Sequence, residues 1–176
     1  IDFAAGIAVV NTGHRHPKVI AAVKDQLDHF THTCHQVVPY ENYVRLAERL
    51  NDIVPIKGEK KSIFVTTGAE AVENAIKIAR FYTGRHKILA RYRSYHGATH
   101  GSIALTGDYR RNAVEPAMPG GVHFLDPFCY RCPFGQKKES CKRECISHLE
   151  EVIKYEGPDK IAAIIMEGVV GSNGLI

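Results

Sequence analysis

Residues 64–74 read Phe64-Val65-Thr66-Thr67-Gly68-Ala69-Glu70-Ala71-Val72-Glu73-Asn74. The β-rich residues 62–66 predict a strand, and the apolar spacing after Gly68 predicts a helix that ends at Gly84. Thr67 and Glu70 have the spacing of a capping box, which defines the start of that helix. Unpaired N–H groups and the positive end of the helix dipole favour an anion there, most often a phosphate. A plain strand-to-helix turn with a good cap explains these residues equally well.

The segments on either side of this stretch alternate between strand and helix. Further strands are predicted at 87–90, 102–105, 122–125 and 161–166, and a helix is predicted over 146–155. Strands that are apolar on both faces and separated by helices indicate an α/β layer with a largely parallel sheet. Before this region, we expect a short strand at 3–10, a helix beginning at Pro17 and a helix over 41–53.

Length and composition restrict the class of protein. The chain has 176 residues, 44% hydrophobic and 24% charged, which is typical of a soluble globular domain. No apolar run approaches the roughly 20 residues of a membrane span. A net charge of +4 without a long cationic block does not favour nucleic-acid binding. No signal peptide is visible, so we expect a cytoplasmic location, and we expect the chain to be a piece of a longer protein.

Four of the five cysteines are clustered, with the spacing C-x2-C-x8-C-x3-C. They are Cys129, Cys132, Cys141 and Cys145. Two such pairs suit a tetrahedral thiolate site for a structural zinc ion. Free buried thiols and a disulfide in an oxidised sample are the alternatives. The odd number of cysteines argues against a secreted disulfide framework.

Several blocks of the chain together resemble class III aminotransferases, and most closely 4-aminobutyrate aminotransferases. The blocks are Ala5 to Val19, His32-Thr33-Cys34, Thr66 to Ala75 and Tyr95-His96-Gly97. The resemblance covers nearly the whole chain and implies a homodimeric enzyme that uses pyridoxal 5′-phosphate (PLP). It also implies the large domain of the fold-type I PLP-dependent transferases, a three-layer α/β/α arrangement that is incomplete here. We therefore expect an N-terminal segment over 1–55 and the first part of the PLP-binding domain over 56–176.

The resemblance also implies roles for individual residues. Cofactor-binding positions fall on Thr67, Gly68, Ala69, Tyr95, His96 and Glu167, and substrate positions fall on Ile7, Ala98 and Ser172. The first three match the phosphate loop, Tyr95 matches the aromatic residue that stacks on the pyridine ring, and Glu167 matches a carboxylate near the cofactor. A half-buried packing role for Tyr95 and core packing for Ile7 are the alternatives.

Two substrate positions depart from the 4-aminobutyrate pattern. Ala98 stands where an Arg commonly contacts the substrate carboxylate, and Ser172 stands where a Glu switches a distal Arg between substrates. Alanine cannot replace a bidentate Arg–carboxylate contact. Both changes leave room for another ω-amine donor, and for a 2-oxo acid acceptor such as pyruvate.

The family's Schiff-base lysine, and the Asp that keeps the pyridine nitrogen protonated, are expected downstream of Glu167. The chain therefore holds no catalytic residue of its own and should be inactive by itself. The resulting hypothesis is part of a transaminase that moves an amino group from an ω-amine to a 2-oxo acid. The alternative is a non-catalytic module that binds zinc through its four clustered cysteines.

Overall fold

In the computed structural model, which describes residues 1–174, helix α4 runs from Gly68 to Thr83. The predicted capping box is present at its start, and Gly84 ends it in a left-handed conformation with φ of 67°. Residues 62–66, predicted as a strand, belong to none of the three strands of the described sheet. That prediction was wrong because β propensity alone does not decide whether a segment joins a sheet.

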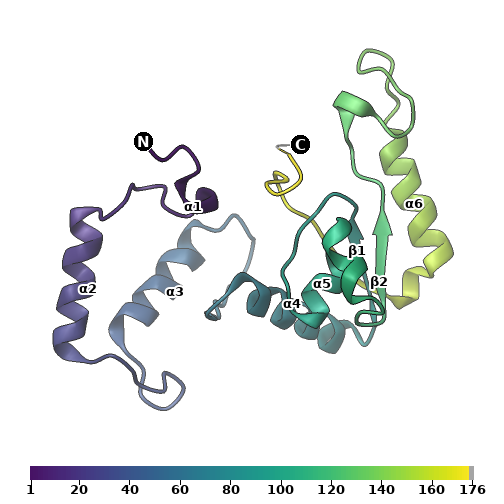
Figure 1. Cartoon of the computed structure of the whole chain (residues 1–176). Coiled ribbons are helices and arrows are strands. Elements are labelled where there is room, and N and C mark those ends of the chain that lie inside the picture. Colours follow the sequence, from purple (N-terminus) through teal and green to yellow (C-terminus); the bar gives the residue numbers. More distant parts are fainter. Residues whose placement is uncertain (175–176) are drawn as a thin grey trace. The chain divides into compact units, whose positions relative to one another are not determined.

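The sheet has three parallel strands in the order β2-β1-β3 (Figure 1). They are β1 (Lys87–Arg91), β2 (Gly121–Phe124) and β3 (Ile161–Ile165), which confirms three of the predicted strands. Strand β1 lies in the centre, with Leu89 opposite Val122 on one side and Ile164 on the other. Because all three strands are parallel, their carboxyl ends lie at the same edge of the sheet.

The core lies between the sheet and helices α4 and α5 (His100–Leu105). Ile76 of α4, Leu105 of α5, and Ile88 and Ala90 of β1 form its buried centre. Leu89 points to the other face of the sheet by strand alternation and is also fully buried, so both faces are covered. These observations agree with the expected layered α/β architecture.

Two further predictions from the sequence were wrong. Residues 102–105, predicted as a strand, belong to α5, whose start is fixed by a capping box between Thr99 and Ser102. Residues 3–10, predicted as a strand, instead contain the short turn α1 (Ala5–Ala8), in which all four residues have positive φ. In both places local hydrogen bonds of a turn or a helix cap outweighed the strand preference that the apolar pattern suggested.

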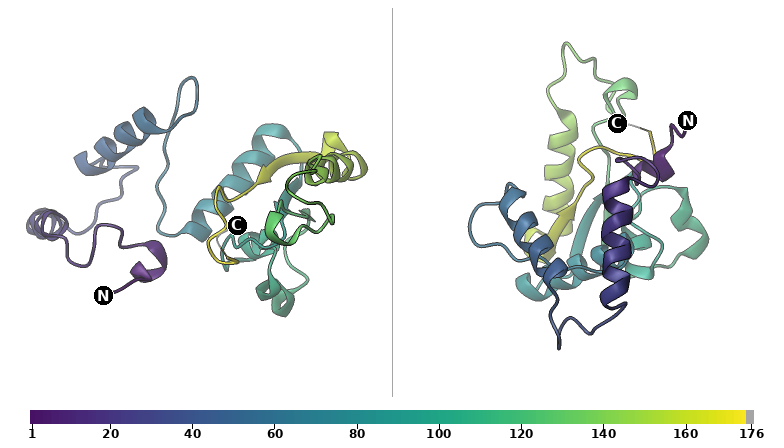
Figure 2. Two further views of the ribbon diagram at one scale, coloured as in Figure 1. Left: turned by 90° about the horizontal axis from the view of Figure 1, so that it is seen from above. Right: turned by 90° about the vertical axis from the view of Figure 1, so that its left-hand side faces the viewer.

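The remaining elements follow the sequence closely. Helix α2 (Pro17–His29) begins at the predicted proline, α3 (Glu41–Ile53) has the predicted bounds, and α6 (Glu144–Glu156) contains the predicted helix. Short 3-10 helices are η1 (Tyr109–Val114), η2 (Cys129–Arg131) and η3 (Pro158–Lys160). Figures 1 and 2 show that the segment between β2 and α6 extends beyond the end of β2 before the chain returns in α6.

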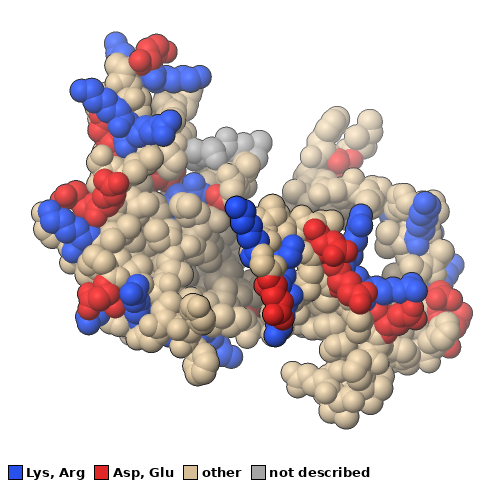
Figure 3. Space-filling view, turned by 180° about the vertical axis from the view of Figure 1, so that it is seen from behind, with Lys and Arg blue, Asp and Glu red and all other residues tan. Residues whose placement is uncertain are grey.

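The chain divides into two units, Ile1–Ile63 and Phe64–Ile176. The first contains α1, α2 and α3, and the second contains the sheet and all the elements around it. The boundary expected after residue 55 stays a prediction. No helix within residues 1–174 is long and apolar enough to cross a bilayer. Figure 3 shows acidic and basic side chains interspersed over the face that it draws.

Candidate functional site: the start of helix α4 and the 95–99 loop

The first turn of α4 presents two unpaired backbone donors. Thr67 Oγ1 accepts a hydrogen bond from Glu70 N at 3.1 Å, and Glu70 Oε2 accepts one from Thr67 N at 3.2 Å. Within residues 1–174, Gly68 N and Ala69 N donate to no acceptor. Both lie at the positive end of the helix dipole, which favours a negatively charged group. The cap uses the Thr67 oxygen only as an acceptor, so its hydroxyl hydrogen remains available as a third donor.

The loop after β1 approaches this helix end closely because it contains Gly97. Gly97 has φ of 134°, a conformation that side chains disfavour. A Cβ added there would lie 2.5 Å from Ser102 Oγ and 2.9 Å from Ala69 Cβ. Only glycine therefore lets the 95–99 loop pass this close to the first turn of α4.

An open cavity of about 690 Å³ lies between the helix end and the loop. Its lining contains Thr67, Gly68, Ala69, Val72, Tyr95, His96, Gly97, Ala98 and Thr99. Five of the six predicted cofactor-binding residues are in this set, as is the predicted substrate residue Ala98. A Cβ added at Gly68 would meet no atom within 4 Å, so the protein itself leaves the space beside this backbone open.

Glu73 fixes the distance between the two walls of the cavity. It lies one turn into α4, and its Oε1 accepts hydrogen bonds from Thr99 Oγ1 at 2.6 Å, Gly101 N at 2.8 Å and Ser102 N at 3.1 Å. The carboxylate thus caps the start of α5 from a neighbouring helix. Partial burial acts to raise the pKa of Glu73, but these donors outweigh it and lower the pKa below its ordinary value.

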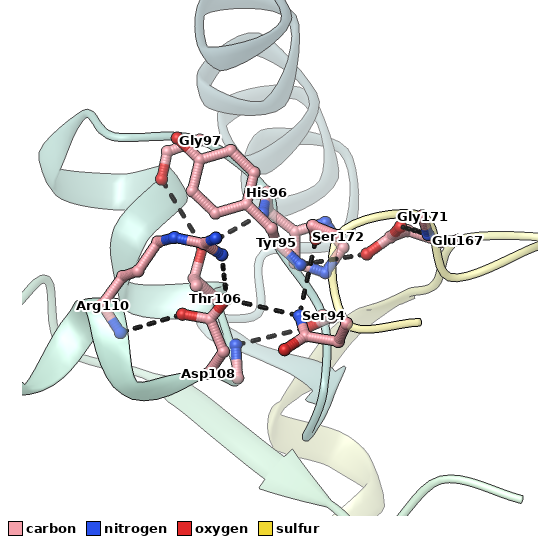
Figure 4. A network of polar contacts seen from close by, with 12 residues as sticks. Ser94, Tyr95, His96, Gly97, Thr106, Asp108, Arg110, Glu167, Gly171 and Ser172 are labelled. Atoms are coloured by element: carbon pink, nitrogen blue, oxygen red, sulfur yellow. Dashed lines mark hydrogen bonds and ion pairs between the residues drawn. The ribbon is translucent and has the colours of Figure 1, made fainter. Parts of the chain in front are cut away.

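Glu167, in the segment that follows strand β3, supports the Tyr95 backbone. Tyr95 N donates to Glu167 Oε1 at 3.0 Å, and Gly171 N donates to Glu167 Oε2 at 3.2 Å (Figure 4). The two segments meet because β1 and β3 are parallel neighbours and both chains leave the sheet at its carboxyl edge. The structure therefore brings Glu167 to the same site as Tyr95.

His96 is buried beside this contact. Its backbone N–H donates to Thr106 Oγ1 at 3.0 Å, and its Nε2 has no hydrogen-bond partner within residues 1–174. Burial lowers the pKa of His96; the Glu167 carboxylate opposes this shift, and the Arg91 guanidinium adds to it. The imidazole is therefore held neutral near pH 7, with one buried ring nitrogen without a partner.

The other two predicted substrate residues are not in the lining of this cavity. Ser172 is exposed on the segment after β3, where Asn173 Nδ2 donates to its Oγ at 3.4 Å. Ile7 lies in α1, in the first unit, with a relative exposure of 92%. The expected roles of both residues toward a substrate stay predictions.

The four clustered cysteines lie between the start of η2 and the first turn of α6. Among the described residues, no group of three or more His, Cys, Asp or Glu side chains could hold a metal ion. Each of the five cysteines is a free thiol. Cys129 Sγ lies 3.7 Å from the Pro127 carbonyl oxygen, and Cys141 Sγ lies 3.8 Å from Glu144 Oε2 and accepts a hydrogen bond from Arg143 N at 3.2 Å. The zinc site that the spacing suggested stays a prediction.

Three contributors to the site were missed in the sequence: Glu73, Asp108 and Arg110. Asp108 is buried, accepts from Arg110 N at 2.9 Å, and forms an ion pair with the Arg110 guanidinium (Figure 4). The sequence near these residues indicated only the start of helix α5. Thr99 and Ser102 have capping spacing, with Ser in place of the usual Glu or Gln, and this marks the helix that Glu73 caps.

Over its whole length the chain is similar to aminotransferases. The family described as Aminotransferase class-III matches residues 1–176. The chain is 46% identical over 179 residues to the 5-aminovalerate aminotransferase DavT of Pseudomonas putida, and 46% identical over 176 residues to the 4-aminobutyrate aminotransferase GabT of Escherichia coli. These alignments cover 100% and 99% of this chain and 40% of each relative.

A solved structure has the same fold over the same region. It is the taurine:2-oxoglutarate aminotransferase from Bifidobacterium kashiwanohense, in complex with PLP and glutamate. The TM-score is 0.90 at 38% identity, covering 99% of this chain and 40% of that one. The chain therefore spans about 40% of the length of the proteins it matches.

Proposed function

Because the chain belongs to the class III aminotransferase family, we propose that it forms the phosphate-binding and ring-binding part of a PLP-dependent transaminase. PLP is the cofactor that this family implies and that a solved neighbour contains. The intact enzyme would move an amino group from an ω-amine to a 2-oxo acid. One observation carries the proposal: two unpaired N–H groups at the start of α4 border a cavity that the Tyr95 loop also lines.

The residues present fit PLP in charge and in shape. Gly68 N, Ala69 N and the Thr67 hydroxyl are donors for a dianionic phosphate at a helix N-terminus. The open space beside Gly68 and the buried, unpartnered Nε2 of His96 are features that a ligand would explain. Ala69 lacks the hydroxyl that the family often has there, but it keeps its backbone donor.

When bound, PLP supplies the electron sink that makes removal of a proton from the amine substrate possible. The chain's own residues hold and orient this group. The three donors at the start of α4 bind the phosphate, and the Tyr95 ring packs against the pyridine ring. Glu167 fixes the Tyr95 backbone, and Glu73 fixes the spacing between the phosphate donors and the Tyr95 loop. The lysine that moves the proton lies outside this chain.

The proposal extends to the substrates. The two relatives described above are named for 5-aminovalerate and 4-aminobutyrate, which are both ω-amino acids, and this supports an ω-amine donor. Ala98 lines the cavity but cannot form an ion pair with a substrate carboxylate. Recognition of the carboxylate therefore falls to a residue other than Ala98. A homodimer, which the family resemblance implies, and a cytoplasmic location are part of the same proposal.

The test uses the intact protein and the 176-residue chain side by side. With added PLP, the intact protein should show an absorption band near the visible edge that borohydride removes, and it should transfer the amino group of 4-aminobutyrate or 5-aminovalerate to 2-oxoglutarate or pyruvate. The 176-residue chain should show no such transfer. Intact, folded protein that shows neither the band nor any transfer would overturn the proposal.

A further inference from the structure

We propose that Arg110 is a positioning residue that holds the Tyr95 ring in the plane the cofactor needs. This inference rests on the proposed function, because it takes Tyr95 as the platform for the pyridine ring. The argument starts from how each of the two side chains is held.

The Tyr95 backbone is fixed, but its ring has few supports. Glu167 binds the backbone N–H, whereas the Tyr95 hydroxyl makes no hydrogen bond within residues 1–174. No aromatic ring of the described chain pairs with it, and the residue is 38% exposed. The contact recorded for the ring is the Arg110 guanidinium, whose Cζ lies 5.2 Å from the ring centroid. This separation is within the range of a cation–π interaction.

Arg110 is held rigidly enough to serve as that support. Asp108 begins the 3-10 helix η1 and accepts from Arg110 N through Oδ1, while its Oδ2 pairs with the guanidinium (Figure 4). Asp108 itself is buried, and Asn173 Nδ2 donates to it at 3.3 Å. A buried carboxylate therefore fixes both the backbone and the head group of Arg110.

The same contacts argue against a direct role for Arg110 in binding a substrate carboxylate. Its charge is already paired with Asp108, and it is not among the residues that line the cavity beside α4. The guanidinium thus reaches the Tyr95 ring from outside that cavity. A group in this place can restrict the tilt of the ring without touching the ligand.

The test uses the intact enzyme and two readouts: the dissociation constant of PLP, and the circular dichroism of the bound cofactor, which reports ring orientation. Arg110→Gln should weaken PLP binding about fivefold, the effect of losing one cation–π contact, and reduce the dichroism. Arg110→Lys, which keeps a cation, should restore most of both. In a Tyr95→Leu background, Arg110→Gln should have no further effect, because the ring it supports is gone.

Arg111 provides the matched control. It lies in the same 3-10 helix with its Cζ 5.6 Å from the Tyr92 ring, and it does not line the cavity beside α4. Arg111→Gln should leave the PLP dissociation constant and the dichroism unchanged. Should Arg110→Gln not fold because Asp108 is left unpaired, the double variant Asp108→Asn with Arg110→Gln removes both charges together and should show the same weakening.

Three results have distinct meanings. Wild-type enzyme that does not bind PLP overturns the proposed function itself. Wild-type enzyme that binds PLP, with Arg110→Gln unchanged in both readouts, overturns only the role of Arg110. An equal loss from Arg110→Gln with and without the Tyr95 ring also overturns it, since the effect would then not pass through that ring.

Discussion

Replacing Glu73 with Gln should destabilise the protein and separate the two walls of the cofactor cavity. The side chain accepts three hydrogen bonds at a single carboxylate oxygen, from Thr99, Gly101 and Ser102. A charge-assisted hydrogen bond contributes about 1.5–3 kcal/mol and a neutral one about 0.5–1.5 kcal/mol. Because Glu73 is only partly buried, we expect Glu73→Gln to lower the free energy of unfolding by about 1–2 kcal/mol. Glu73→Ala, which also leaves α5 without its cap, should cost about 2–3 kcal/mol.

The assay is urea unfolding of the intact apoprotein at several pH values. The pKa of Glu73 is lowered in the folded state, so its stabilising contribution is complete above its ordinary value of 4.5. That contribution is lost as the pH falls through the lower folded-state pKa. The difference between wild type and Glu73→Gln should therefore be largest near neutral pH and shrink in acid.

Glu151→Gln is the control for a general effect of removing a helix carboxylate. Glu151 is exposed on α6 and lies 3.6 Å from Lys154 in an ion pair, which should be worth little. If Glu73→Gln unfolds at the same urea concentration as Glu151→Gln, the carboxylate does not connect α4 to α5 as described. The same conclusion follows if the loss caused by Glu73→Gln does not depend on pH.

Three further substitutions test other parts of the site. Gly97→Ala should lower the free energy of unfolding by about 2–4 kcal/mol, because its Cβ would overlap Ser102 at a positive φ; an unchanged Tm would contradict this. Thr67→Ala should lower the free energy of unfolding by about 1 kcal/mol through the lost cap and should also weaken PLP binding. A loss of stability with an unchanged PLP dissociation constant would show that Thr67 is not a phosphate donor. Burial lowers the pKa of both His96 and His123, so the unfolded state binds more protons below pH 6.5 and stability should fall from pH 7 toward pH 5. His123→Gln should flatten that slope, and a slope equal to that of wild type would show that His123 is not the source.

The elements that the sequence predicted correctly are those defined by local chemistry. The capping box at Thr67 and Glu70, the proline that begins α2 and the glycine that ends α4 each act within a few residues. The apolar strand β1 also follows directly from the sequence, because both faces of this central parallel strand are buried. The apolar run of β3 predicted a strand too, although β3 lies at the edge of the described sheet and is only partly buried.

The incorrect predictions involve segments whose state depends on distant residues. Residues 102–105 are as apolar as a strand but belong to a helix, because Glu73 accepts hydrogen bonds from Gly101 N and Ser102 N and a capping box between Thr99 and Ser102 marks its start. Residues 62–66 have strand composition but are not among the three strands of the described sheet. The site is subject to the same limit. The phosphate donors and Tyr95 were predicted, whereas the support from Asp108 to Arg110 to the Tyr95 ring exists only once β1 and η1 have folded together.

A crystal structure of the intact protein with PLP is the most direct test of the central claim. The phosphate oxygens should accept hydrogen bonds from Gly68 N and Ala69 N, with the pyridine ring against Tyr95. A phosphate bound away from the first turn of α4, or side chains of the missing region filling that cavity in place of the cofactor, would contradict the account.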